Sequence, residues 1–150
     1  MSEHVAEIVW RRRSESFAYE AYNRAHEWRF DGGVAVPASA APAYRGEPER
    51  VDPEEAFVAA IASCHMLTFL AIAAKKRFVV DSYEDRAVGH MEKNEAGRLA
   101  IARVELAPRI AFAPGAAPDP ETLRRMHHDA HENCFIANSV KTEIAVRHQD

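Results

Sequence analysis

The chain has 150 residues, of which 47% are hydrophobic and 28% charged, and its formal net charge is −4. This length and composition are typical of one soluble globular domain, residues 1–150, and the mildly negative charge argues against a nucleic-acid-binding surface. The N-terminal segment MSEHVAEIVW has neither a basic start nor an apolar core, so we predict no signal peptide and a cytoplasmic location.

The first third of the chain has the pattern of β-strands. His26, Trp28 and Phe30 alternate with polar residues and are followed by a turn signal, Asp31-Gly32-Gly33, which predicts a hairpin. The segments HVAEIVW (4–10) and SFAYEAY (16–22) are also predicted to be strands. Residues 37–50 contain three prolines and no periodic pattern, so a loop is expected there.

A long helix is predicted to follow this loop. Asp52 is a good N-cap, Pro53 suits the first helical position, and Glu55 completes a capping box. Residues 56–74 are apolar on nearly every face, so we expect a central helix that is covered on all sides. The segment is long enough to cross a membrane, but it is rich in alanine and has polar residues at its centre, so no membrane span is predicted.

The second half alternates between strands and one more helix. The segments 78–91 and 98–112 are predicted to be strands that flank a turn at Asn94 and Gly97. A second helix begins after Asp119 and runs to about Asn133, and residues 139–146 form a last strand. The resulting order, β-β-β-α-β-β-α-β, predicts an α+β fold with strands around long central helices.

The two cysteines, Cys64 and Cys134, are the main candidates for chemistry, and both fall on predicted helices. The plain alternative is that each packs as a small buried hydrophobic residue. A thiol that reduces a peroxide must be a thiolate, and it needs a second thiol to resolve its sulfenic acid. His65 is adjacent in sequence, but neighbouring helical side chains point about 100° apart. The activating charge is therefore expected from another segment.

Two motifs around these cysteines resemble those of a known family. DPEEAFVAAIASCHM (52–66) and AHENCFIANS (130–139) are similar to the first and second cysteine motifs of the osmotically inducible protein C and organic hydroperoxide resistance (OsmC/Ohr) family. Phe135 stands where members of that family commonly have proline. The resemblance implies an OsmC-like intertwined homodimer without metal or cofactor, which reduces organic hydroperoxides and defends against oxidative stress.

The resemblance also implies roles for individual residues. Cys64 would form a sulfenic acid, and Cys134 would resolve it through a Cys64–Cys134 disulfide. Glu54 would hold an activating arginine, for which Arg24 is preferred and Arg45 is the alternative. The implied partners are an organic hydroperoxide substrate, a second copy of the chain and a thiol reductant such as a dihydrolipoyl protein.

Helix geometry limits how such a site is assembled. Ten residues separate Glu54 from Cys64, and in one helix this spacing corresponds to roughly 15 Å along the axis. Glu54 therefore cannot reach the thiol of its own chain. We expect two copies of the helix to cross antiparallel in a dimer, so that each site is shared between chains.

Two other functions fit the same residues. His127, His131 and Cys134 have the i, i+4, i+7 spacing of a metal site, with Cys64 as a possible fourth ligand. Histidines among charged neighbours on a helix are, however, expected to be exposed. The other alternative is a non-enzymatic module that binds an apolar ligand near Cys64. No phosphate-binding glycine loop or serine-hydrolase motif occurs in the sequence.

Overall fold

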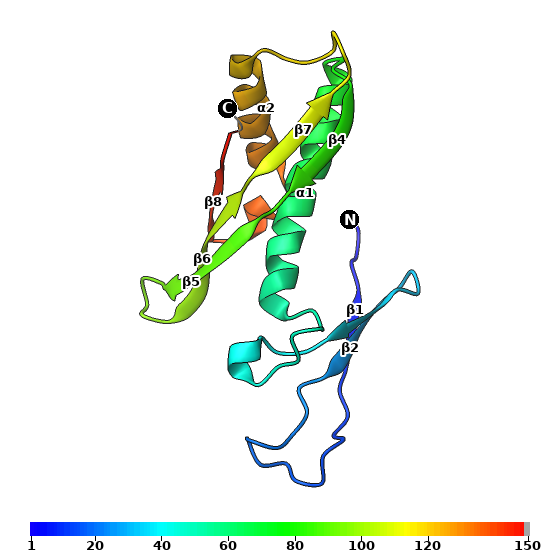
Figure 1. The fold of residues 1–150 in the computed structure, drawn as a ribbon, viewed down its shortest axis with the longest axis vertical. Coiled ribbons are helices and arrows are strands. Elements are labelled where there is room, and N and C mark those ends of the chain that lie inside the picture. The colour runs from blue at the N-terminus through cyan, green and yellow to red at the C-terminus, as the bar shows by residue number, and fades with distance from the viewer. Residues whose placement is uncertain (149–150) are drawn as a thin grey trace. The chain divides into compact units, whose positions relative to one another are not determined.

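A computed structural model describes residues 1–148 of the chain (Figure 1). The chain forms two compact units, Met1–Ala56 and Phe57–Asp150, and each is described by itself. The long helix α1 (Pro53–Lys75) begins in the first unit and continues through the second.

Unit 1 contains a three-stranded antiparallel sheet in the order β1-β2-β3. Its strands are β1 (Ala6–Val9), β2 (His26–Phe30) and β3 (Ala35–Ala38), and the predicted hairpin between β2 and β3 is confirmed. The prediction of a strand over residues 16–22 is wrong, because this segment forms turns and coil. Its aromatic rings pack against one another and against Trp10 instead of joining a sheet.

The last residues of unit 1 form a loop that leads into α1 and caps its first turn. The predicted loop over 37–50 is largely confirmed, with a short 3-10 helix, η1 (Pro42–Tyr44), although β3 extends to Ala38. The capping box is present: Glu55 N–H donates to Asp52 Oδ1 at 2.8 Å, and Asp52 N–H donates to Glu55 Oε1 at 3.2 Å. These two bonds satisfy backbone donors that the first helical turn leaves unpaired.

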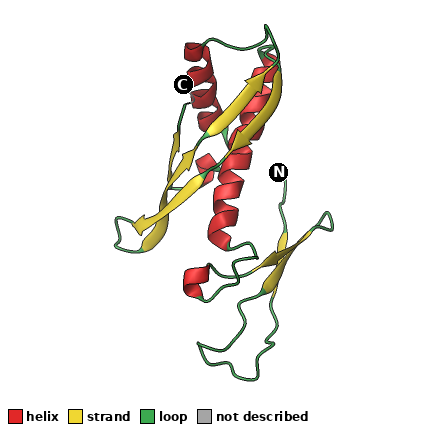
Figure 2. Ribbon diagram, viewed as in Figure 1, coloured by secondary structure: helices red, strands yellow, loops and turns green. Residues whose placement is uncertain are grey.

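In unit 2, each of the two predicted middle strands is divided in two (Figure 2). The first gives β4 (Val80–Asp85) and β5 (Val88–Lys93), and the second gives β6 (Leu99–Leu106) and β7 (Pro108–Phe112). β4 pairs with β7 and β5 pairs with β6, so the four strands form one long two-stranded ribbon with a break near its middle. At the break, Ala107 N–H donates to Asp85 Oδ1 at 2.7 Å.

The remaining elements complete an α+β fold, as predicted. Helix α2 (Pro120–Asn133) is capped by Asp119, whose carboxylate accepts from Thr122 N–H at 2.7 Å. A short 3-10 helix, η2 (Ala137–Ser139), and strand β8 (Glu143–Val146) follow it. The last strand is therefore shorter than predicted, and it runs parallel to β6.

Helix α1 buries one stripe of side chains, spaced four residues apart: Ile61, His65, Phe69 and Ala73. Ile61 packs with β6 side chains in one core cluster, and Phe69 and Ala73 pack with α2 in a second cluster. One chain thus fully buries a single face of α1, and cover of the other faces by a second copy of the chain stays a prediction. By length and composition α1 would pass as a membrane span, but a core helix meets the same criterion.

Candidate active site

The fold of unit 2 brings the two cysteines together. Cys64 lies in the middle of α1 and is half-buried, whereas Cys134 caps the C-terminal end of α2 and is buried. Both thiols are free, and they are close enough for Cys64 to influence the ionisation of Cys134. Cys64 and Cys134, which belong to separate sequence motifs, are therefore neighbours in the fold.

The surroundings of Cys134 favour its thiol form. Burial raises the pKa of the Cys134 thiol, and the neighbouring Cys64 thiol raises it further. Ala137 N–H donates to the Cys134 sulfur at 3.4 Å and acts in the opposite direction. Since the thiolate is the reactive nucleophile, this environment lowers the reactivity of Cys134 in the reduced state.

Two buried histidines connect α1 to α2 directly after Cys64. Nε2 of His65 lies 3.0 Å from Nδ1 of His127, and the two rings are nearly parallel, with centroids 5.3 Å apart. Phe69 stacks on His127 from one turn further along α1, with centroids 4.5 Å apart. The expectation that His127 is exposed is therefore wrong, because its side chain fills the contact between the helices.

This pairing also argues against the metal-site alternative. Nδ1 of His127 is already engaged by His65, and Cys134 accepts a hydrogen bond from backbone. Within residues 1–148, no group of three or more histidine, cysteine, aspartate or glutamate side chains is arranged to hold a metal ion. His127, His131 and Cys134 share a helix face in the sequence without forming a metal centre.

Glu54 lies in the first turn of α1, within unit 1. Its Oε2 atom is buried and has no hydrogen-bond partner in the described part of the chain. A buried carboxylate oxygen without a partner is costly, so this position favours a cationic neighbour. The adjacent Glu55 is different, because its carboxylate is used in the capping box.

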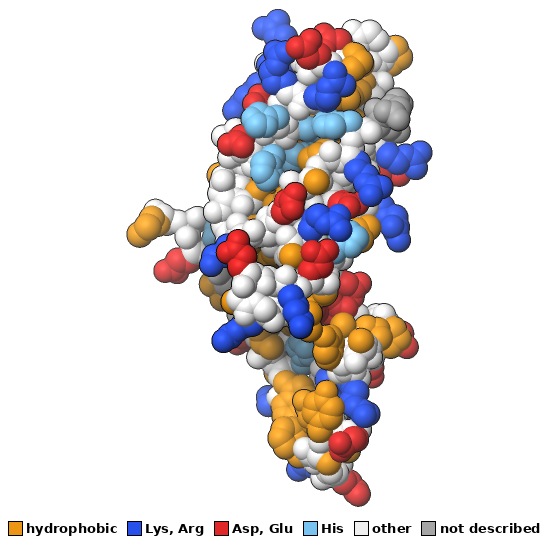
Figure 3. All heavy atoms as spheres, turned by 90° about the vertical axis from the view of Figure 1, so that its left-hand side faces the viewer, with side chains coloured by type: hydrophobic (Ala, Val, Ile, Leu, Met, Phe, Trp, Pro, Cys, Tyr) orange, Lys and Arg blue, Asp and Glu red, His pale blue; other side chains and the backbone are white. Residues whose placement is uncertain are grey.

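Arg24 lies in a pocket of about 370 Å³ in unit 1, with mostly aromatic and small side chains around it. The residues that line it are Trp10, Phe17, Tyr22, Arg24, His26, Ser39, Ala40 and Pro53. Hydrophobic side chains also gather on the face of unit 1 shown in Figure 3.

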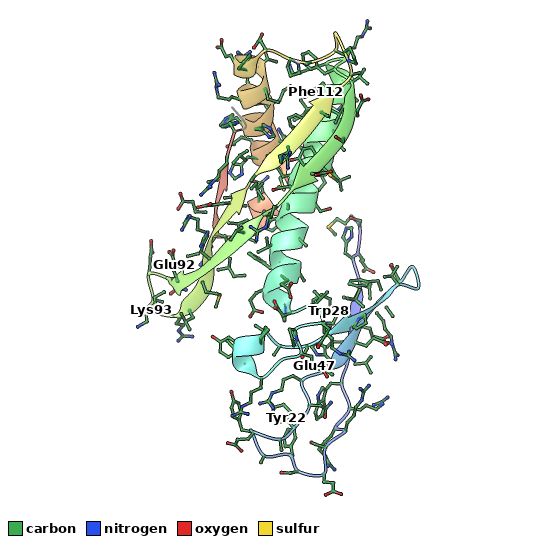
Figure 4. All side chains as sticks on the ribbon, in the orientation of Figure 1. Tyr22, Trp28, Glu47, Glu92, Lys93 and Phe112 are labelled. Carbon is green, nitrogen blue, oxygen red and sulfur yellow. The ribbon has the colours of Figure 1, made fainter. Side chains whose placement is uncertain are left out.

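The Arg24 guanidinium is held by residues of its own loop. Tyr22, which belongs to this loop, is labelled in Figure 4. It lies 3.6 Å from the centroid of the Tyr22 ring and donates to the Tyr22 and Tyr19 carbonyl oxygens at 2.6 and 2.7 Å. Arg45, the alternative, is exposed and ends the short helix η1 in a left-handed conformation, with φ 68°. Arg24 and Pro53, the residue before Glu54, line the same pocket.

Sequence reasoning missed the histidine pair and the aromatic pocket. One signal for the pair was present, because His65 lies on the four-residue spacing of Ile61, Phe69 and Ala73. A histidine on the buried stripe of an apolar helix requires a polar partner inside the core. The pocket had no comparable signal, since Trp10, Phe17 and Tyr22 come from two segments whose pattern predicted strands.

Comparisons with known proteins agree with this architecture. A family model described as OsmC-like protein matches residues 46–149. The solved structure of an OsmC-like protein of unknown function from Vibrio cholerae is 51% identical, with a TM-score of 0.95, and the match covers 98% of this chain and 99% of that one. No curated protein sequence matches this chain.

More distant structures share the fold. An organic hydroperoxide resistance protein from Elizabethkingia anophelis is 16% identical, with a TM-score of 0.72 over 97% of this chain and 93% of that one. A putative organic hydroperoxide resistance protein from Vibrio cholerae, solved with captopril in one of its active sites, is 21% identical. Its TM-score is 0.66, over 93% of this chain and 90% of that one.

Proposed function

Because this chain belongs to the OsmC-like protein family, we propose that it is a thiol-dependent peroxidase that reduces organic hydroperoxides. The observation that carries the proposal is the pairing of two free thiols in different environments. Cys64 is half-buried at mid-helix, and Cys134 is buried beside it with a raised pKa. This arrangement suits one cysteine that meets the peroxide and a second that resolves the product.

The proposed cycle has three steps. The Cys64 thiolate attacks the outer oxygen of the hydroperoxide, so that the O–O bond breaks and Cys64 becomes a sulfenic acid, while the alkoxide leaves and takes up a proton from solvent to give the alcohol. The Cys134 thiol then displaces water from that sulfenic acid and forms the Cys64–Cys134 disulfide. A dithiol reductant, such as a dihydrolipoyl protein in the cytoplasm, finally reduces the disulfide and is itself oxidised.

The difference between the thiols supports this order. A thiol kept protonated by burial reacts slowly with peroxide, so Cys134 is spared from the first step. Because Cys134 is buried next to Cys64, the sulfur within its reach is the one that the peroxide has just oxidised. The same burial protects Cys134 from side reactions with other oxidants.

We propose that the site is completed by a second copy of the chain. Helix α1 is continuous from Pro53 to Lys75, so Glu54 and Cys64 of one chain are separated by roughly 15 Å along its axis. Glu54 and an arginine, Arg24 in preference to Arg45, would therefore serve the partner subunit's Cys64. The buried, unpartnered Oε2 of Glu54 supports a role in holding that arginine.

The aromatic pocket around Arg24 supports an organic substrate. Burying apolar area is favourable by roughly 25 cal/mol per Å², and hydrogen peroxide has no apolar group to bury. We therefore propose that bulky organic hydroperoxides are reduced faster than hydrogen peroxide, with Trp10, Phe17 and Tyr22 around the organic group.

Intact mass spectrometry after one equivalent of cumene hydroperoxide tests the proposal. The expected result is the loss of two hydrogens per chain, with a peptide map that places the disulfide between Cys64 and Cys134. Equimolar hydrogen peroxide should produce the same disulfide more slowly. An unchanged mass with cumene hydroperoxide, or equal rates for the two oxidants, would contradict the proposal.

The same pocket favours one alternative, a non-enzymatic protein that binds an apolar ligand. This alternative makes the thiols incidental. It predicts that Cys64→Ser and Cys134→Ser bind an apolar probe such as cumyl alcohol as tightly as the unmodified protein and that neither thiol is oxidised stoichiometrically. The mass experiment separates the two functions.

A further inference from the structure

A second cavity in unit 1, of about 300 Å³, is lined by four arginines. They are Arg11, Arg13, Arg29 and Arg50, and the one acidic side chain on the lining is that of Glu27. This cavity is distinct from the aromatic pocket, although His26 borders both. The peroxidase function proposed above does not use these arginines.

The alternation of the sheet explains why these residues gather. Val9 pairs with Glu27 across β1 and β2, and Glu27 pairs with Pro37 across β2 and β3, so the three side chains share one face. Arg29 belongs to the same face because it is two residues beyond Glu27. The opposite face of β2 carries His26 and Trp28.

The Asn23 side chain holds the segment that follows β1. Its side-chain amide donates to the Arg11 carbonyl oxygen at 2.9 Å, and its Oδ1 accepts from Arg13 N–H at 2.7 Å. The backbone between Arg11 and Arg13 is thereby held against Asn23, and both side chains line the cavity. The Arg12 guanidinium instead donates to the carbonyl oxygens of Ser14 and Glu15.

The charges on the lining do not cancel. Arg29 Nε lies 2.6 Å from Glu27 Oε1, and Arg50 Nε lies 2.7 Å from Glu47 Oε2, so these two arginines have carboxylate partners. Arg11 and Arg13 have no side-chain ion pair or hydrogen bond among residues 1–148. Two guanidinium groups without a carboxylate partner therefore line a cavity that already carries net positive charge.

We propose that this cavity binds a small soluble oxyanion with at least two negative charges, such as the phosphate group of a metabolite. Guanidinium groups form paired hydrogen bonds with planar or tetrahedral oxyanions. Two neighbouring arginines therefore match a ligand with two negative charges better than they match a single carboxylate. A phosphate monoester carries about −1.5 to −2 charges near neutral pH and three acceptor oxygens. The cavity volume suits a small molecule.

Isothermal titration calorimetry with pyrophosphate at low ionic strength tests the site. Saturable binding with one site per chain is expected, and it should weaken as salt is added. The double variant Arg11→Gln/Arg13→Gln should bind at least about tenfold more weakly, because both charge-assisted contacts are lost. Arg12→Gln is the matched control, since it removes a neighbouring charge outside the cavity, and it should bind pyrophosphate as the unmodified protein does.

Two further measurements determine which class of anion the cavity binds. Acetate, a single carboxylate, should bind at least about tenfold more weakly than pyrophosphate. Sedimentation with phosphatidic acid vesicles should not depend on Arg11 and Arg13. The proposal is overturned if pyrophosphate does not saturate at millimolar concentration, if acetate binds equally well, if Arg12→Gln loses as much affinity as the double variant, or if vesicle binding requires the same two arginines.

Discussion

His65 and His127 form a hydrogen-bonded pair of uncharged imidazoles between α1 and α2, with 3.0 Å between Nε2 and Nδ1. Burial, and next the charge of His131, lowers the pKa of His65 to about 4. Burial, followed by the charges of His65 and His148, lowers the pKa of His127 to about 3. One ring nitrogen donates and the other accepts, so the pair satisfies both polar groups without a charge in the core.

We expect the free energy of unfolding to fall as the pH is lowered from about 7 to about 4. In the unfolded chain these histidines take up protons near pH 6.5, whereas in the folded chain they stay neutral until about pH 4 and 3. The unfolded state binds more protons in this window, so stability increases with pH, by at most about 1.4 kcal/mol per pH unit for each histidine. Urea unfolding across this window measures the slope.

The control for this experiment is a histidine on the same helix. His128 is exposed, so His128→Gln should keep the pH dependence of the unmodified protein. His127→Gln should be less stable near neutral pH and should have a shallower slope. Equal slopes in His127→Gln and the unmodified protein would show that other groups cause the loss of stability in acid.

The two cysteine variants should fail at different steps. Cys64→Ser should abolish the reduction of organic hydroperoxides, because no thiol remains to attack the peroxide. Cys134→Ser should complete one turnover and then accumulate Cys64 as sulfenic acid and, with excess peroxide, as sulfinic acid. Dimedone labelling followed by mass spectrometry distinguishes these species, and full activity in Cys64→Ser would be incompatible with the proposed cycle.

Adjacent glutamates at the start of α1 should separate activity from stability. Glu54→Ala should lower the peroxidase rate at least several-fold and cost at most about 1 kcal/mol of stability through the helix dipole. Glu55→Ala removes the bond from Asp52 N–H to the Glu55 carboxylate and keeps the reverse bond from its own backbone N–H, so it should cost at most about 1 kcal/mol of stability and leave the rate largely unchanged. Steady-state rates and urea unfolding of both variants check this, and similar rates in the two would remove Glu54 from the site.

Arg24 and Arg45 can be compared in the same way. Arg24→Gln should lower the peroxidase rate by about tenfold or more, because a hydrogen bond to a charged group is worth roughly 1.5–3 kcal/mol. Arg45→Gln should have a smaller effect, since Arg45 is exposed and does not line the aromatic pocket. The opposite ranking of the two rates would assign the activating role to Arg45.

The uncovered face of α1 leads to a prediction about association. Leu67 is 60% exposed in a single chain, although the helix around it is strongly apolar. If a second copy covers this face, Leu67→Arg should weaken the dimer at least tenfold, or about 1.4 kcal/mol. Leu99→Arg, at a leucine in β6 that is 61% exposed, is the control. Sedimentation velocity measures both, and a monomeric unmodified protein at micromolar concentration would refute the dimer and the shared site.

The sequence predicted the elements whose signals are local. The start of α1 depends on Asp52, Pro53 and Glu55, which act on backbone within the same turn. The break between β4 and β5 was missed because it depends on contact with the other strand, where Ala107 bonds to Asp85. Residues 16–22 alternate as a strand does, but no strand within the described residues 1–148 pairs with them, and their rings pack locally instead.

Only part of the candidate site could be predicted from the sequence. The two cysteine motifs identified Cys64 and Cys134 because their pattern resembles a family. The partner of His65 could not be predicted, since it lies 62 residues away and depends on how α1 packs against α2. His127 was instead predicted to be exposed, because the charged residues around it in the sequence carry no information about a contact between two helices.

The two cysteines have different backbone conformations, and this difference predicts which helix would adapt in the proposed redox cycle. Cys64 is in the middle of a 23-residue helix, where a shift of the main chain would disturb hydrogen bonds on both sides. Cys134 ends its helix in an extended conformation and is followed by a single 3-10 turn, so fewer regular bonds restrain it. In the proposed cycle, closing and opening the disulfide would thus be accommodated by movement of residues 134–139, while the helix that carries Cys64 would keep its conformation.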